Sequence, residues 1–219
     1  MVLIGEIRDQ ETAEIAVQAS LTGHLVFSTL HTNDAPGATT RLVDMGIEPY
    51  LVASSLEMVL AQRLVRLVCP HCRVAMEPSA SDLNGLRSEF GDHAPTVLYH
   101  GTGCRECRGT GYKGRNGVFE IMPLTDEIRT MILNRASSGE VRKVAIAQGM
   151  HSLRDDGLRL VLEGRTTLEE VLRVTKDEMA SAGVFKKPAS EKAEAPEPEA
   201  APQPAPAALA ARGERMRSR

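Results

Sequence analysis

Short apolar runs and amphipathic stretches alternate over the first third of the chain, and their order predicts an α/β fold. An apolar run over residues 1–4 ends at Gly5 and leads directly into Glu6, and a second run over residues 25–27 is followed by polar residues as far as His31. Short apolar runs of this kind are typical of buried parallel strands. The carboxyl ends of parallel strands meet at one edge of an open α/β sheet, where ligands bind. We therefore expect Glu6 and His31 to lie at one edge.

Helices are predicted between and after these strands. Asp9 is a candidate N-cap for a helix that stops near residue 23, and Asp34 for a second helix that ends at residue 46. Apolar residues then continue over residues 49–66, which we interpret as one long helix. This order predicts a doubly wound half-domain whose sheet exposes an edge and a face.

A second region of regular structure is predicted after residue 117. Residues 118–122 are expected to form a short strand that Pro123 ends. Helices should follow from a series of hydroxyl-bearing residues, Thr125, Ser138, Ser152 and Thr167. Thr167 and Glu170 have the spacing of a capping box. We predict a helical subdomain over residues 124–180.

The composition changes sharply near residue 183. Six of the 12 prolines lie between Pro188 and Pro206, in a segment that is otherwise mainly Ala, Glu and Lys. Such a segment buries too little apolar surface to offset the entropy lost on ordering. Residues 181–219 are therefore predicted to be a disordered tail.

The four cysteines fall into two pairs with the pattern C-x2-C-x31-C-x2-C. Two such pairs are typical of a structural Zn²⁺ site with four thiolate ligands, here Cys69, Cys72, Cys104 and Cys107. Disulfides and unrelated thiols are the alternatives, and His71 or His93 is a less favoured substitute ligand. We predict a tetracysteine zinc-binding subdomain over residues 67–123.

Charge and hydropathy argue against a nucleic-acid partner and against a membrane-spanning helix. The formal net charge is -3 and the sequence pI is about 6.1, which gives no electrostatic case for a nucleic-acid partner. No segment approaches the roughly 20 apolar residues of a membrane-spanning helix, and no signal peptide is evident. We expect a cytoplasmic protein whose membrane contact is peripheral.

Several motifs in order resemble the hexameric traffic ATPases of type II secretion and type IV pilus assembly. They begin with Gly-Glu-Ile-Arg-Asp from Gly5 and Ser-Thr-Leu-His-Thr-Asn-Asp from Ser28, and continue through the two cysteine pairs to Asp-Asp-Gly-Leu from Asp155. The resemblance covers roughly residues 1–177 and implies a partial RecA-like P-loop NTPase core over residues 1–66. It also implies ATP with Mg²⁺ as cofactor, a homo-hexamer, and inner-membrane platform proteins as partners in type II secretion or pilus assembly.

The resemblance assigns expected roles to individual residues. Glu6 takes the Walker B role, with Mg²⁺ or the attacking water as its target. His24 and His31 match the histidine box, and Thr29 adds a polar contact at the strand tip. Arg8 is expected to pair with Asp9 or with a phosphate on an adjacent subunit. Glu6, His31 and Arg8 are thus candidate catalytic residues, and Glu6, His24, Thr29 and His31 candidate nucleotide-binding residues.

One family motif is missing from the 219 residues. No Gly-x-x-x-x-Gly-Lys-Ser/Thr sequence occurs, so the loop that cradles phosphates is not present. We interpret the sequence as the C-terminal part of such an ATPase and expect no appreciable ATP hydrolysis by this chain alone. The alternatives are a free-standing zinc module, since residues 104–111 fit the C-x-x-C-x-G-x-G repeat of J-domain co-chaperones, and a zinc-ribbon nucleic-acid binder. Neither explains the first 60 residues.

Overall fold

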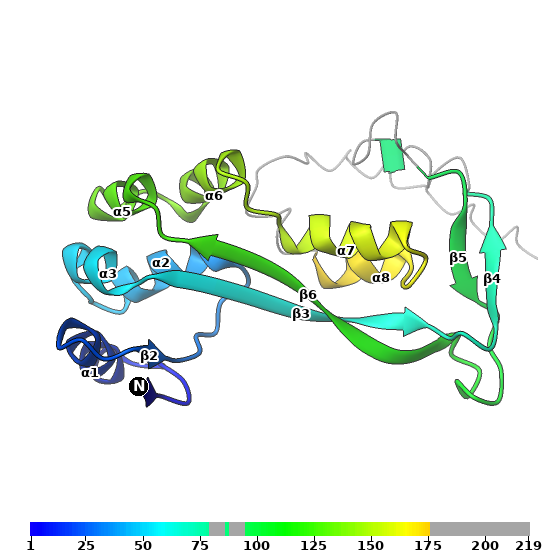
Figure 1. Ribbon diagram of the computed structural model, residues 1–219, viewed down its shortest axis with the longest axis horizontal. Coiled ribbons are helices and arrows are strands. Elements are labelled where there is room, and N and C mark those ends of the chain that lie inside the picture. The colour runs from blue at the N-terminus through cyan, green and yellow to red at the C-terminus, as the bar shows by residue number, and fades with distance from the viewer. Residues whose placement is uncertain (79–85, 88–94, 176–219) are drawn as a thin grey trace, which may run out of the picture. The chain divides into compact units, whose positions relative to one another are not determined.

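The computed structural model describes residues 1–78, 86–87 and 95–175. The predicted tail over residues 181–219 and His93 lie outside the described residues. Figure 1 shows the described part of the chain in colour.

The predicted strand-helix-strand unit at the start of the chain is confirmed. Strand β1 (Val2–Leu3) pairs in parallel with β2 (Val26–Phe27), and helix α1 (Gln10–Leu21) connects them. The side chain of Asp9 caps α1 by accepting a hydrogen bond from the backbone N–H of Thr12 at 2.8 Å. Parallel pairing brings the carboxyl ends of both strands to the same edge.

Helix α2 (Ala35–Asp44) also begins where the sequence predicts. The Asp34 side chain accepts a hydrogen bond from the N–H of Gly37 at 2.7 Å, and Pro36 is accommodated in the first turn. The helix stops before Gly46, whose φ of 98° is left-handed and suits glycine.

The prediction of one long helix over residues 49–66 is wrong. Helix α3 (Pro49–Ser55) covers only the first part, and the chain continues as strand β3 (Met58–Val68). β3 pairs antiparallel with β6 (Tyr112–Pro123) along most of its length, in the register Leu60↔Ile121 (Figure 1). A nearly unbroken apolar run does not distinguish a helix from a strand, and the partner strand lies more than 40 residues further along the sequence.

Two short strands were not predicted. β4 (Arg73–Met76) pairs antiparallel with β5 (Leu98–Gly101), directly after the first cysteine pair and directly before the second. The residues of β4 are exposed, so they carry no hydrophobic alternation that would mark a strand.

The predicted helices of the C-terminal region are confirmed. They are α5 (Asp126–Leu133), α6 (Ser138–Ala147), α7 (Leu153–Leu162) and α8 (Leu168–Val174). Thr125, Ser137, Ser152 and Thr167 serve as N-caps, and reciprocal capping boxes form at α6 and α7. At α8 only half of the expected box forms, because the Glu170 carboxylate is engaged elsewhere.

Helices α5 and α6 pack into the same core as the first strands and helices. Ile128 of α5 and Val141 of α6 belong to one buried cluster with Val17 of α1 and Leu42 of α2, and Met122 of β6 joins it. β6, which falls in the predicted zinc subdomain, pairs with β3 and contributes to this core. The domain boundaries stay a prediction. None of the described helices is long and apolar enough to cross a lipid bilayer.

Candidate functional site

Glu6 and His31 meet at the carboxyl edge of the β1–β2 pair. The Nε2 atom of His31 lies 3.0 Å from Oε2 of Glu6, a hydrogen-bond distance between residues 25 positions apart. Glu6 follows β1 and His31 follows β2, so the parallel pairing is what brings them together. The His31 side chain is 80% exposed and that of Glu6 34%, and both are open to a ligand from solvent.

Arg8 completes this group from the turn after Glu6. Its guanidinium pairs with Oε1 of Glu6, and not with Asp9, whose carboxylate caps α1. The hydrogen bond from His31, followed by that from Arg8, holds the pKa of the Glu6 carboxyl below its usual value. Glu6 is therefore an ionised carboxylate at neutral pH, with one partner on each oxygen.

Thr29 and His24 lie in different places relative to this group. The Thr29 hydroxyl donates to the Gly5 carbonyl at 2.8 Å and so ties the ends of the two strands together. His24 precedes β2, at the opposite edge of the strand pair, and its Nδ1 lies 3.1 Å from the Thr22 hydroxyl. The structure thus brings together Glu6, Arg8 and His31, with Thr29 bonded to the neighbouring Gly5, and does not bring His24 to this edge. A cofactor-binding role for His24 stays a prediction.

A buried ionic network lies directly after His31, and no local sequence pattern indicates it. Arg142 of α6 donates to Oδ2 of Asp34 at 2.6 Å and to Oε2 of Glu120 at 3.4 Å. Oε1 of Glu120 accepts from the backbone N–H of Ala35, the first residue of α2, at 2.8 Å. These side chains come from positions up to 108 residues apart, so only the tertiary fold reveals the network.

The four cysteine sulfurs gather as a zinc site requires. All four Sγ atoms lie within 4.8 Å of one another. The separations are 3.9 Å for Cys69–Cys104, 3.9 Å for Cys72–Cys107 and 3.7 Å for Cys104–Cys107. Sulfurs bound at about 2.3 Å to a tetrahedral Zn²⁺ lie about 3.8 Å apart, so the donor set fits this ion. All four thiols are free, which removes the disulfide alternative for this structure.

Backbone groups favour the thiolate form of Cys107. Although burial opposes it, hydrogen bonds from the N–H groups of Cys104 and Gly111 lower the pKa of the Cys107 thiol to about 6. Burial raises the pKa of Cys72 to about 11. Gly111 also lies so close to Gly101 that a Cβ atom on it would be 2.4 Å from the Gly101 carbonyl oxygen. Glycine is therefore needed where the chain wraps the cysteines.

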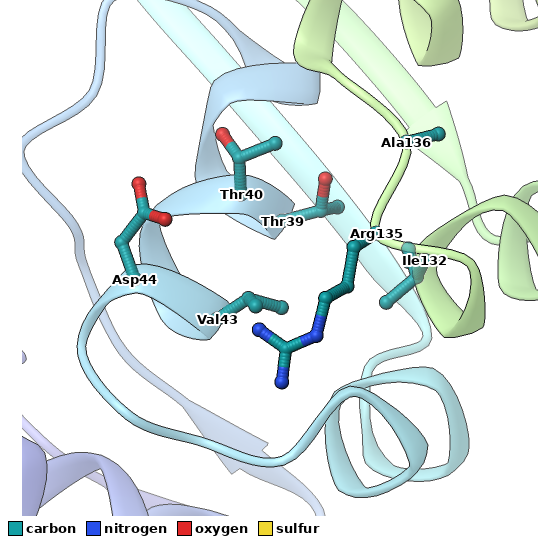
Figure 2. Close-up of a pocket in the computed structure, with 7 residues that line it drawn as sticks. All are labelled: Thr39, Thr40, Val43, Asp44, Ile132, Arg135 and Ala136. Atoms are coloured by element: carbon teal, nitrogen blue, oxygen red, sulfur yellow. The ribbon is translucent and has the colours of Figure 1, made fainter.

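A pocket among the described residues lies away from the Glu6–His31 group. It has a volume of about 180 Å³, lies between α2 and the end of α5 and is lined by Thr39, Thr40, Val43, Asp44, Ile132, Arg135 and Ala136. Figure 2 shows the Arg135 side chain extending between Val43 and Ile132. Drug-sized ligands occupy roughly 300–1,000 Å³, so this pocket is too small for a nucleotide. The Glu6–His31 group, rather than this pocket, is therefore the candidate functional site.

A parallel strand pair with acidic and imidazole groups at its carboxyl edge, followed by a cysteine tetrad and helices, defines an α/β protein with a candidate ligand site at a sheet edge. A family model described as "Type II/IV secretion system protein" matches residues 1–173. The chain belongs to this family.

Curated relatives support the same assignment. The type II secretion system protein E of Pseudomonas aeruginosa is 54% identical over 178 residues, 81% of this chain and 35% of that protein. The type II secretion system ATPase E of Vibrio cholerae is 51% identical over 81% of this chain and 35% of its own length. The type IV pilus assembly ATPase PilB of Thermus thermophilus is 50% identical over 80% of this chain and 20% of its own length. The chain thus spans about a third of the type II relatives.

Solved structures share the fold. The pilus retraction motor PilT, crystallised with ADP, matches 79% of this chain and 39% of its own with a TM-score of 0.52 and 24% identity. The ATPase DotB of Yersinia pseudotuberculosis matches 80% of this chain and 37% of its own with a TM-score of 0.53 and 20% identity. At these identities the similarity establishes the α/β fold alone.

Proposed function

We propose that this chain supplies the acidic and histidine half of the nucleotide site of a type II secretion or type IV pilus assembly ATPase with a RecA-like core. The Glu6–His31 contact at the sheet edge is the observation that carries the proposal. Nucleotide-hydrolysing α/β proteins place an acidic residue at a strand tip, where it holds Mg²⁺ or orients the attacking water.

The contacts of Glu6 favour the second of these roles. Both carboxylate oxygens already have a partner, Arg8 on one and His31 on the other. Direct coordination would place Mg²⁺ next to the positively charged guanidinium of Arg8, whereas a hydrogen bond from a water uses a free lone pair of either oxygen and adds no charge. Bound Mg²⁺ would neutralise phosphate charge. In this proposal Glu6 orients the water, His31 senses the terminal phosphate, and Thr29 fixes the spacing of the two strands.

Arg8 has a separate role in the proposal. Its side chain is 69% exposed, so its guanidinium can exchange Glu6 for a phosphate, including one held by an adjacent subunit of a homo-hexamer. Arginine is suited to this exchange because its planar fork binds carboxylate and phosphate alike. His24, at the other edge, would link neighbouring segments.

The 219-residue chain alone should not hydrolyse ATP appreciably. The phosphate-cradling loop supplies much of the charge stabilisation in phosphoryl transfer, and its motif does not occur in this sequence. We expect less than about 0.1 turnovers per second from the purified chain, compared with roughly 1–100 per second for phosphoryl-transfer enzymes such as kinases. Faster turnover that co-purifies with the chain and is lost in Glu6→Gln would refute this expectation.

The catalytic assignment itself is tested in a longer protein that joins a P-loop segment to this chain. Glu6→Gln keeps the size of the side chain and its capacity to accept a hydrogen bond, but removes the charge. We expect at least a 100-fold loss of ATP turnover with nucleotide binding retained, a typical magnitude for general acid–base groups. Glu11→Gln, on the exposed face of α1, is a matched control that should leave turnover unchanged. An active Glu6→Gln enzyme would overturn the assignment.

The remaining parts of the proposal concern location and partners. The cysteine tetrad would hold a structural Zn²⁺, and the complete ATPase would work as a cytoplasmic homo-hexamer, peripheral at the inner membrane, against membrane platform proteins. A free-standing zinc module would leave the Glu6–His31–Arg8 group without a role. Co-sedimentation of the longer protein with inner-membrane vesicles that do or do not contain the platform proteins tests this location.

A further inference from the structure

We infer that Glu120 and Arg142 are positioning residues for the nucleotide site, because they hold the loop that carries His31. Neither belongs to the strands or helices that form the β1–β2 edge. Their importance for turnover rests on the proposed function, whereas the link to His31 stands on geometry alone.

The loop over residues 30–34 is fixed at both ends. At its start, the Thr29 carbonyl accepts from the N–H of Ile7 at 2.9 Å, which holds it to the segment after β1. At its end, the Asp34 carboxylate is shared between the N–H of Gly37 and the guanidinium of Arg142. His31 lies between these anchors with an exposed side chain, so its direction depends on where the two ends are held.

Glu120 holds the second anchor through the backbone. Its carboxylate accepts from the N–H of Ala35 on one oxygen and from the guanidinium of Arg142 on the other. One carboxylate thus joins the N-terminus of α2 to α6, and the dipole of α2 favours a negative charge at this point. The Glu120 side chain is fully buried and that of Arg142 is 7% exposed, so neither can relax into solvent.

This arrangement connects helix α6 with the site. Arg142 lies on α6 and donates to both Glu120 and Asp34 within one buried network. A displacement of α6 relative to α2 would have to break or move these bonds. The direction of His31 towards Glu6 is therefore coupled to the packing of α6 against α2.

The chain offers a matched control for this inference. Glu170 is also a fully buried carboxylate paired with arginine, but it binds Arg66 of β3 and Arg173 of α8. Substituting either glutamate with glutamine removes a buried charge at similar burial. Only Glu120→Gln should alter His31.

The test is a nitrogen-15 NMR spectrum of the histidine side chains of the 219-residue chain, without nucleotide, at neutral pH. The His31 signal is assigned by its loss in His31→Gln. The spectrum of Glu6→Gln gives the chemical shift that His31 has when its partner is not ionised. We expect Glu120→Gln and Arg142→Met to move the His31 signal towards that position. Glu170→Gln should leave the His31 signal at its wild-type position. Arg142→Lys keeps the charge, so its His31 signal should lie between those of Arg142→Met and the wild-type chain.

Three outcomes would each overturn the inference. The first is a His31 signal that does not move in Glu120→Gln and Arg142→Met, and the second is a signal that moves equally in Glu170→Gln. The third is a signal that does not change in Glu6→Gln, which would mean that the Glu6 contact does not exist. If Glu120→Gln fails to fold, Arg142→Lys and Arg142→Met decide between these results. Because the assay contains no nucleotide, its result is independent of whether the chain belongs to an active ATPase.

Discussion

The guanidinium of Arg66 donates two hydrogen bonds to the carboxylate of Glu170, at 3.0 Å and 2.6 Å, across 104 positions of sequence. A third comes from the backbone N–H of Arg66 at 3.1 Å, and Arg173 adds two more. Arg66 also stacks on the Tyr112 ring, 4.2 Å from its centroid. Glu170 therefore ties α8 to the end of β3, just before the first cysteine pair.

This contact predicts a loss of stability in acid. Although burial opposes it, the hydrogen bonds from Arg173 and Arg66 lower the pKa of Glu170 from 4.5 to about 2. A lowered pKa in the folded state means that the stabilisation is complete above pH 4.5 and is lost as the pH falls towards 2. It amounts to about 3 kcal/mol. Urea unfolding at pH 7, 5, 4 and 3 should show the decrease.

Glu170→Gln is the control for the acid effect. The variant should be less stable than the wild-type chain at pH 7, and the difference should shrink towards pH 3. Glu120 should act in the opposite direction, because burial raises its pKa and protonation in acid relieves that cost. An equal deficit of Glu170→Gln at pH 7 and pH 3 would contradict the assignment.

The cysteine tetrad predicts one Zn²⁺ per chain. Elemental analysis should find this stoichiometry, and a chelator should lower the free energy of unfolding by about 3 kcal/mol or more, equivalent to roughly 6–12 °C in Tm. Cys72→Ser and Cys104→Ser should each lower the zinc content and the Tm. His71→Ala is the matched control within the first pair and should keep full zinc content. Loss of zinc in His71→Ala would mean that the imidazole replaces a thiolate.

Local patterns predicted the helix starts and the cysteine tetrad because the information lies within a few residues. Asp9, Asp34, Thr125 and Ser152 cap their helices through bonds to backbone groups three positions away. The two cysteine pairs depend on the same kind of short spacing. The convergence of Glu6 and His31 was also predictable, because it follows from the parallel pairing of two adjacent strands.

Contacts between distant segments were beyond these patterns. Glu170 has the spacing of a capping residue for Thr167, yet its carboxylate turns to Arg66, because a charge-assisted bidentate pair is stronger than a bond to a backbone N–H. Glu120 falls in an apolar strand with no sign of its helix-joining role. Strand β3 was mistaken for helix because its pairing with β6 is non-local. Each error concerns an interaction whose partner the local sequence does not contain.

Gly157 predicts a tight contact between α7 and α8. A Cβ atom at this position would lie 2.6 Å from Cγ1 of Val171, a side chain with no exposed surface. Gly157→Ala should destabilise the chain by about 1–2 kcal/mol, because the overpacking outweighs the gain of roughly 1 kcal/mol in helix propensity. In urea unfolding, the double variant with Val171→Ala should be more stable than the sum of the single effects predicts. Simple additivity would show that the two side chains do not meet.

Asp9 and Asp34 both cap a helix, but replacing them with alanine should lower the free energy of unfolding by different amounts. Each caps a helix, through the N–H of Thr12 and Gly37 respectively, but only Asp34 also binds a buried arginine. Asp9→Ala should cost about 1 kcal/mol, the ordinary value for a lost N-cap. Asp34→Ala should cost about 3–5 kcal/mol, because Arg142 then loses a carboxylate partner at 2.6 Å in a site where its side chain is 7% exposed. Asp34→Asn retains a capping oxygen and should restore only the capping part. Equal costs for Asp9→Ala and Asp34→Ala in urea unfolding at pH 7 would show that the buried network adds nothing to the cap.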